Sequence, residues 1–326
     1  MRMIIDTDPA MGTVGGDPED SFAIMLGLVS PEVSLEGITV VQGNVPVDHG
    51  FANATHLLNL MGRSDVPLLA GCTEPLNAPG RSDQLAWLAG RASLDSLVPE
   101  IEPAADAQHA VEFIVDTVLA NPGEITIVGI GPLTNLGEAI RREPSVAELV
   151  DRFVLMAGNA AVAGNITPFA EFNVWQDPEA AAIVFESGAR ITVAGLDVCE
   201  QTHLSAKTID SMRGATELGT FVADSVAVFM QIRSDIFGAD NLHLYDSLSV
   251  AAAIDASIIE TEDTLVRVDT ESDLCAGATV AYLSPFQKIM WTQDETNCAW
   301  GTVVDLEAFD ALFGTRVLRE LLGATL

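Results

Sequence analysis

The first twenty residues read MRMIIDTDPAMGTVGGDPED (residues 1–20), a short apolar run followed by a glycine-rich acidic loop. Four more short runs, each apolar almost throughout, follow along the chain at 35–41, 125–128, 153–156 and 191–194. Longer stretches with helical patterns separate them, which is typical of βαβ units. Strands without polar alternation are covered on both faces. We therefore predict an α/β fold: an open, mostly parallel twisted sheet with helices on both faces.

The helical stretches carry recognisable start and stop signals. Asp177, Pro178 and Glu179 are typical of a helix N-terminus, and Gly188 of the end that follows. An amphipathic segment at 306–322 predicts a final helix. Because no linker, repeat or change of composition interrupts the sheet rhythm, we predict a single domain spanning residues 1–326.

The composition excludes several classes of partner. The chain of 326 residues carries 47 Asp and Glu against 15 Lys and Arg, for a net charge of −32. Nucleic-acid affinity depends on cations that neutralise phosphates, and Lys207 and Lys288 are the only lysines. We therefore expect no nucleic-acid partner and no docking on anionic lipid. No apolar run approaches the ~20 residues that cross a bilayer, so we expect no membrane partner either.

Cysteine usage suggests the compartment. The four cysteines stand far apart without a C-x-x-C pair or metal-ligand spacing: Cys72, Cys199, Cys275 and Cys298. They are typical of buried thiols in a reducing environment. The segment 1–8 reaches a carboxylate after a few apolar residues and lacks the apolar core of a secretory signal. We expect a cytoplasmic protein.

Acidic and amide side chains follow the predicted strands. Asp6, Asp8, Asp17, Glu19 and Asp20 come after the first strand, while Asn44, 129–135 and 156–159 follow the next three. In open α/β sheets, ligands bind beyond the carboxyl ends of the strands. Clustered carboxylates repel one another unless a cation lies among them, and Ca²⁺ accepts six to eight oxygens in irregular geometry. The cluster indicates a calcium site, with helix capping by Asp20 as the alternative.

Other chemistries fit less well. An Asp-x-Asp after a strand also occurs in haloacid-dehalogenase-like phosphotransferases, but neither lysine lies in a strand-end motif that could bind phosphate. Gly129-Ile130-Gly131 lacks the third glycine of the dinucleotide fingerprint. No G-x-S-x-G is present, and the five histidines follow no triad or zinc spacing.

Taken in order, these motifs resemble the inosine-uridine-preferring nucleoside hydrolase family over essentially the whole chain. The matching segments are DTDP (6–9), ED (19–20), GN (43–44), GPLTN (131–135), LM (155–156), AEFN (170–173), DPEAA (177–181), YD (245–246) and VVD (303–305). The resemblance implies hydrolysis of the N-glycosidic bond of a ribonucleoside, giving ribose and free base, with Ca²⁺ at the bottom of the pocket.

The resemblance also implies roles for individual residues. Asp8, Asp20 and Asp246 would supply carboxylate oxygens to Ca²⁺, and the backbone of Ile130 a carbonyl oxygen. The ion would hold the ribose hydroxyls and a water, while Asp8 accepts that water's proton as it attacks C1′. The implied substrate-binding residues are Glu19 or Asp17, Asn44, Asn165, Glu171 and Asn173. Met156 and Trp175 are candidates for the pocket wall, with core packing as the alternative.

The chain departs from the family pattern in three places. The family's short Pro-Gly-x-Asp-Asp stretch is here lengthened by an insertion that ends in Glu19-Asp20, so that Asp17 could replace Glu19. Tyr245 stands where some members carry a histidine that protonates the leaving base. His243 is a second candidate acid, with a surface position as the alternative. The stretch Gln84 to Ser96 lacks the histidine that some members present over the pocket.

These departures leave a rival hypothesis, a non-catalytic protein that binds a ribosyl ligand on the same fold. Retention of Asp8, Asp20 and Asp246 argues against it. Base-facing residues would lie around Leu85 and Arg233, and the sequence does not rank purine against pyrimidine. We expect a homo-oligomer, a dimer or a tetramer, acting on a small-molecule nucleoside.

Overall fold

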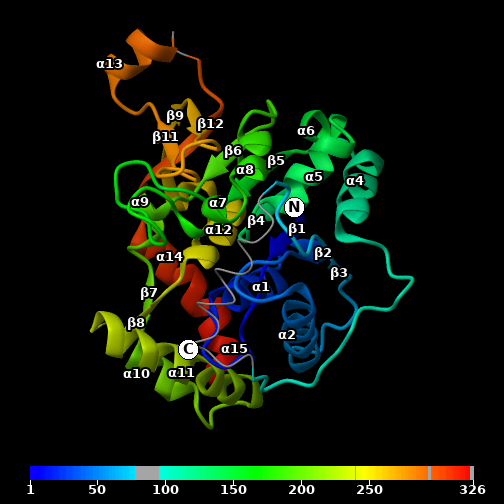
Figure 1. The fold of residues 1–326 in the computed structure, drawn as a ribbon. Helices are drawn as coiled ribbons and strands as arrows, with labels where there is room; N and C mark the ends of the chain where they lie inside the picture. Colours follow the sequence, from blue (N-terminus) through cyan, green and yellow to red (C-terminus); the bar gives the residue numbers. More distant parts are fainter. Residues whose placement is uncertain (78–94, 239, 293–294, 324–326) are drawn as a thin grey trace.

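The computed structural model describes residues 1–77, 95–238, 240–292 and 295–323 (Figure 1). A central sheet has the strand order β3-β2-β1-β4-β5-β6-β12-β9. Its strands are β1 (Arg2–Thr7), β2 (Ser34–Val40), β3 (Leu68–Ala70), β4 (Ile125–Gly129), β5 (Arg152–Leu155), β6 (Ile191–Val193), β9 (Ile259–Thr264) and β12 (Cys298–Val304). Every neighbouring pair is parallel except β12 with β9. The predicted α/β fold with a mostly parallel sheet is confirmed.

Helices cover both faces because successive side chains of a buried strand point to opposite sides. Met3 and Ile5 pack into one apolar core, while Ile4 between them packs into the other. The first core includes α1 (Glu19–Val29), α2 (Val47–Leu60), α12 (Tyr245–Ile254) and α14 (Leu306–Phe313). The second includes α4 (Ala110–Ala120), α5 (Thr134–Arg142), α6 (Ser145–Leu149) and α8 (Pro178–Phe185). In Figure 1, α4, α5 and α6 lie together on one side of the molecule.

The remaining elements surround this frame. The helices are α7 (Phe172–Gln176), α9 (Leu196–Cys199), α10 (Ala206–Met212), α11 (Glu217–Phe237), α13 (Pro285–Gln287) and α15 (Arg319–Leu322). Two small sheets pair β7 (His203–Ser205) with β8 (Asn241–His243), and β10 (Val266–Val268) with β11 (Thr279–Ala281). The predicted helix at 306–322 forms, with a π-helical turn at Gly314–Leu318 between α14 and α15. No helix of the described residues is long and apolar enough to cross a membrane. The single domain over 1–326 stays a prediction.

The strand order places a crevice at one point of the sheet edge. The chain passes from β1 to β2 on one side and later returns to β4 on the other side of β1. Because the order reverses there, the loops after β1 and β4 diverge and leave room between them. The acidic loop after β1 and the Ile130-Gly131 turn after β4 therefore meet at this point.

Candidate active site

Asp8 lies just after β1 and is almost fully buried between two glycines. Its Oδ2 accepts a hydrogen bond from the backbone N–H of Asn44 at 2.7 Å. Its Oδ1 is buried and has no hydrogen-bond partner within the described residues. A Cβ on Gly131 would lie 2.8 Å from that Oδ1, and a Cβ on Gly43 would lie 2.7 Å from the carboxyl carbon. Both neighbours must therefore be glycine for the carboxylate to occupy this place.

Asp20 belongs to the first turn of α1 but turns inward toward β1. Its Oδ1 accepts hydrogen bonds from the Thr7 hydroxyl at 2.5 Å and the Asp8 backbone N–H at 3.0 Å. Its Oδ2 accepts one from the side-chain amide of Asn44 at 3.2 Å. These bonds tie the start of α1 to the end of β1. The carboxylate is therefore part of the Asp8 cluster, which corrects the alternative in which Asp20 only caps a helix.

Glu19 and Asp246 join the cluster from opposite sides. Asp246 lies in the first turn of α12 and is 4% exposed. The Oε2 of Glu19 accepts a hydrogen bond from the backbone N–H of Tyr245 at 2.6 Å. Asp17, half-buried, accepts one from the backbone N–H of Glu19 at 3.2 Å. The loop after β1 and the start of α12 are thus joined through side-chain to backbone contacts.

Burial raises the pKa of all five acids, and repulsion from neighbouring carboxylates raises it further in Asp8, Asp17, Glu19 and Asp246. Loss of solvent is the main cause for Asp8, Asp17, Glu19, Asp20 and Asp246. Repulsion from Asp20 adds to the raised pKa of Asp8, Asp17 and Asp246. The pKa of Asp17 rises to about 7 even though the Arg233 guanidinium acts to lower it. An opposite charge among these carboxylates would favour their charged form.

The donor set fits a hard divalent cation in its chemistry. Its side-chain donors are carboxylate oxygens, which Ca²⁺ and Mg²⁺ prefer, and Asp8 Oδ1 is a buried oxygen that no described residue hydrogen-bonds. Within the described parts of the chain, however, no group of three or more His, Cys, Asp or Glu residues is already arranged to hold a metal ion. The oxygens of Asp20 are engaged by protein donors. An ion would therefore have to draw these carboxylates together.

A cavity of about 170 Å³ opens beside the cluster. Its lining comes from the loops after β1, β2, β4 and β5 and from α1, α7 and α12: Asp17, Glu19, Asn44, Ile130, Met156, Asn165, Ile166, Glu171, Phe172, Asn173, Tyr245 and Asp246. Ten of the predicted site residues thus line the same cavity. Asp8 and Asp20 lie next to it through their hydrogen bonds to Asn44.

The amide and acid side chains after β5 hold the shape of this cavity. The Asn173 side-chain N–H₂ donates to the carbonyls of Ile130 and Met156, each at 3.1 Å. Both oxygens of Glu171 accept backbone N–H groups, from Gly158, Asn173 and Val174. Glu171 therefore caps α7 in addition to lining the cavity.

Tyr245 and His243 form a stacked pair at the edge of the cavity. Their ring centroids are 4.9 Å apart, with 23° between the planes. Tyr245 lines the cavity and His243 does not. Burial lowers the pKa of His243 to about 4 and raises the pKa of the Tyr245 phenol far above its usual value. Neither ring is therefore a ready proton donor at neutral pH.

The comparisons with known proteins agree with this geometry. Residues 3–311 match the family model described as inosine-uridine preferring nucleoside hydrolase. The chain belongs to the nucleoside hydrolase family. A probable uridine nucleosidase 2 of Oryza sativa is 35% identical over 85% of this chain and 81% of its own length. The pyrimidine-specific ribonucleoside hydrolase RihB of Escherichia coli K12 is 34% identical over 86% of each chain.

A solved structure shows the same fold in a further relative. The purine-preferring ribonucleoside hydrolase from Gardnerella vaginalis superposes with a TM-score of 0.86 and 29% identity, covering 99% of this chain and 100% of that one. The nucleoside hydrolase described here is an N-ribohydrolase, an enzyme that hydrolyses the N-glycosidic bond of ribonucleosides. The phosphotransferase alternative is therefore wrong.

Some predicted residues lie elsewhere in this nucleoside hydrolase. Trp175 is half-buried in α7, with its backbone against Gly277, and is not among the residues that line the cavity. Its predicted role as a pocket wall gains no support. Leu85 and most of the stretch from Gln84 to Ser96 lie outside the described residues.

Sequence reasoning missed a supporting layer beneath Asp8. Asp6 is fully buried, and its Oδ1 accepts hydrogen bonds from the Thr39 hydroxyl at 2.5 Å and the Asn135 amide at 2.8 Å. Burial raises the pKa of Asp6 to about 7. Asn135 also binds the backbone N–H of Cys72 through its Oδ1 at 2.8 Å. The available signal was the position of Asp6 within the apolar run of β1, two residues before Asp8.

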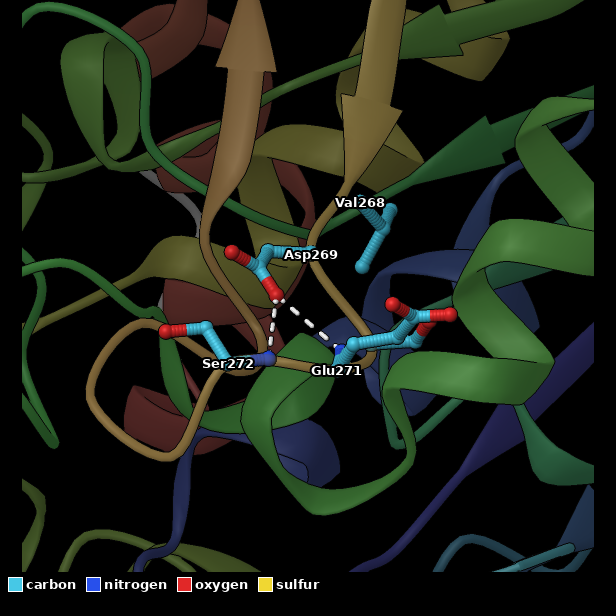
Figure 2. A pocket seen from close by; sticks show the side chains of 5 residues that line it. Val268, Asp269, Glu271 and Ser272 are labelled. Carbon is cyan, nitrogen blue, oxygen red and sulfur yellow. Dashed lines mark hydrogen bonds between the residues drawn. The ribbon is translucent and has the colours of Figure 1, made fainter.

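A second hollow lies far along the chain, at the turn between β10 and β11. It is lined by residues 268–272, and Figure 2 shows Asp269 turned back onto that turn. The Asp269 carboxylate accepts the backbone N–H groups of Glu271 at 3.1 Å and Ser272 at 2.9 Å. This acid therefore shapes the turn.

Proposed function

We propose that this nucleoside hydrolase is calcium-dependent and uses Asp8 as its general base. The observation that supports this most strongly is Asp8 Oδ1, a buried carboxylate oxygen beside a cavity, which takes no hydrogen bond from the part of the chain that the structure describes and lies within a cluster of five acids. A buried polar atom left unpaired costs roughly 1–3 kcal/mol, and more when it is charged. A ligand that engages Oδ1 removes that cost.

Asp8, Asp20 and Asp246 would hold the ion through their carboxylates, and Ile130 through its backbone carbonyl. When bound, Ca²⁺ supplies positive charge that orients ribose hydroxyls and makes a water more acidic. All three side chains are at most 4% exposed, so the ion would be shielded from bulk solvent.

The other steps of the proposed reaction are assigned to side chains around the cavity. Asp8 accepts the proton of the water that attacks C1′, because its Oδ1 is available while Oδ2 is fixed by the Asn44 backbone. The acids around the cavity stabilise the positive charge that develops on the sugar in an oxocarbenium-like transition state. Asn44 and Asn173 bind ribose hydroxyls through oxygens that their own hydrogen bonds leave free. Asn165 and Glu171 face the 5′ side, and Met156 forms the wall.

Tyr245 contacts the leaving base without titrating. With its raised pKa, the phenol keeps its proton and can donate a hydrogen bond or stack on the base. His243 supports the Tyr245 ring from behind. We assign no base preference, because the named relatives include both pyrimidine-specific and purine-preferring enzymes.

We also propose a cellular location and an oligomeric state. The four cysteines are free, which suits a cytoplasmic location. A dimer or tetramer is proposed, and sedimentation of the purified chain tests it.

The deciding experiment measures free ribose released from a panel of purine and pyrimidine nucleosides, with and without a chelator. We expect hydrolysis that the chelator abolishes and that Ca²⁺ restores. Asp8→Asn should lose about 10²–10⁴-fold in kcat, because an amide cannot accept the proton. The matched control is Glu260→Gln, which removes one acidic charge from the exposed part of β9. Full activity in the presence of chelator would show that the enzyme does not depend on Ca²⁺. Wild-type kcat in Asp8→Asn would show that Asp8 is not the general base.

A second experiment measures binding of the ion through protein stability, without measuring catalysis. An ion that binds only the folded state raises the melting temperature as its concentration rises. We expect Ca²⁺ to raise the melting temperature of stripped wild-type protein and to have a smaller effect on Asp246→Asn. Equal shifts in both would show that Asp246 does not hold the ion.

A further inference from the structure

The cavity beside the acids opens to solvent at one end. Of the described residues that line it, Asn165 is the only exposed one, while the others are buried or half-buried. Asn165 lies in the loop between β5 and α7, residues 156–171, which we call the mouth loop. The mouth of the cavity therefore lies at this loop, whereas the almost fully buried Glu19 and Asp246 line its interior.

Apolar side chains line this mouth. Ile166 lies in the mouth loop and Phe172 begins α7, and both are half-buried and line the cavity. On the same loop, Val162 is 37% exposed and Phe169 is 50% exposed. The stretch 156–170 contains no Asp, Glu, Lys or Arg, although these residues make up 19% of the chain. The mouth is thus a largely apolar surface on a strongly acidic protein.

The two polar side chains at the mouth already have hydrogen-bond donors within the protein. Asn165 Oδ1 accepts the backbone N–H of Phe172 at 2.9 Å. Glu171 is almost fully buried, and its two oxygens accept the backbone N–H groups of Gly158 at 2.9 Å and Asn173 at 2.8 Å. These acceptor oxygens therefore do not depend on a hydroxyl of the substrate for a partner.

Contacts from outside the cavity hold the mouth loop in place. The Thr279 hydroxyl accepts the Asn159 N–H at 2.9 Å and donates to the Asn159 carbonyl at 2.6 Å. The Asp197 carboxylate accepts the backbone N–H groups of Ala160 at 2.9 Å and Ala161 at 2.7 Å. Because these bonds involve no ligand, the mouth is formed before a substrate binds, and less conformational freedom is lost on binding.

We infer that this enzyme also accepts nucleosides whose 5′ carbon carries an apolar group in place of the hydroxyl, such as 5′-deoxy and 5′-alkylthio nucleosides, and that Ile166 and Phe172 contact that group. The inference rests on the proposed function, in which the base lies at Tyr245 while Asn165 and Glu171 face the 5′ side. The reaction is the same hydrolysis: water adds across the C1′–N bond, the base leaves, and the 5′ substituent stays on the ribose.

The physical reason lies in what the missing hydroxyl leaves behind. A site rejects an analogue without a hydroxyl strongly when its own buried polar groups are then left unpaired. Here backbone donors already pair both oxygens of Glu171 and the Oδ1 of Asn165. An apolar substituent gains contact instead, which corresponds to about fourfold in binding for each buried methylene.

The experiment compares kcat/KM of the wild type in Ca²⁺ for three substrates with the same base: the parent ribonucleoside, its 5′-deoxy analogue and its 5′-methylthio analogue. An inosine series and a uridine series are both measured, because the named relatives include purine-preferring and pyrimidine-specific enzymes. We expect the 5′-deoxy analogue to stay within about tenfold of the parent. The 5′-methylthio analogue should exceed the 5′-deoxy analogue by about 4–15-fold.

Two substitutions in the mouth loop test the apolar contact. Ile166→Ala removes apolar surface from the cavity wall, so the ratio of 5′-methylthio to 5′-deoxy kcat/KM should fall about 3–10-fold. Val162→Ala is the matched control, because it shortens an exposed apolar side chain of the same loop that is not among the residues lining the cavity. Its ratio should equal that of the wild type. A ratio of two substrates within one variant is independent of the fraction of protein that folds.

The outcomes separate this inference from the function beneath it. If the wild type hydrolyses neither parent nucleoside, the proposed function fails. If it hydrolyses a parent but loses more than about tenfold on the 5′-deoxy analogue, the site requires the 5′-hydroxyl and the inference is wrong. A wild-type ratio of 5′-methylthio to 5′-deoxy at or below one also overturns it. An unchanged ratio in Ile166→Ala would show that Ile166 does not contact the substituent.

Discussion

Gly43→Ala is the perturbation whose effect follows most directly from the structure. The new methyl group would lie 2.7 Å from the Asp8 carboxyl carbon and 2.9 Å from Pro132 Cδ, against 3.4 Å or more for an ordinary contact. Asp8 Oδ2 would lie closer still, so movement of Asp8 or of the 43–44 backbone has to absorb at least 3.4 − 2.7 = 0.7 Å. Either movement breaks the 2.7 Å hydrogen bond from Asn44 to Asp8.

A catalytic group displaced by about 1 Å costs on the order of 10²-fold in rate. We therefore expect kcat/KM of Gly43→Ala to fall about 100-fold, equivalent to about 2.7 kcal/mol of transition-state stabilisation. Overpacking of this kind costs about 1–3 kcal/mol of stability as well. Ribose release from a nucleoside measures the first effect, and urea unfolding measures the second.

Gly314→Ala is the matched control for this substitution. A Cβ at Gly314 meets nothing within 4 Å, and its backbone is helical, so we expect unchanged activity and equal or slightly higher stability. If Gly43→Ala keeps the wild-type kcat/KM, the position of the Asp8 carboxylate does not limit the reaction. The reasoning from the packed glycines would then be refuted.

Three other predictions concern the rest of the site. Tyr245→Phe should keep most activity on nitrophenyl riboside, which needs no protonation, and on a natural nucleoside; a large loss confined to the nucleoside would show that the phenol is the acid. Asn173→Ala should lower kcat/KM about 10–100-fold, because its amide bonds to Ile130 and Met156 hold the cavity wall; an unchanged value would show that the wall holds without them. Burial lowers the pKa of half-buried His243 from 6.5 to about 4, so the unfolded chain binds more protons between these values. Stability should therefore fall as pH drops through that window, by about 1–2 kcal/mol after allowance for solvent screening, and urea unfolding should show a weaker pH dependence in His243→Gln.

Much of the site could be predicted from the sequence because strand ends are encoded locally. The apolar runs fix which residues leave the sheet at its carboxyl edge, and Asp8, Ile130 and Met156 each follow a buried strand. The cavity unites ten of the predicted residues, while Asp8 and Asp20 bond to Asn44 on its wall. Trp175 is not among the residues that line the cavity. It lies in α7, a helix of five residues whose side chains point in several directions, and the sequence pattern does not specify the direction of each.

The sequence by itself determined the α/β class, the parallel sheet and the gathering of acids, because these depend on short-range periodicity and on composition. Only the tertiary structure decided what each acid does. Glu19 meets the N–H of Tyr245 across 226 positions of chain, and Asp8 fits between Gly43 and Gly131 from two other loops. Such contacts depend on how helices and loops from distant segments pack together, and no local pattern of residues specifies that packing.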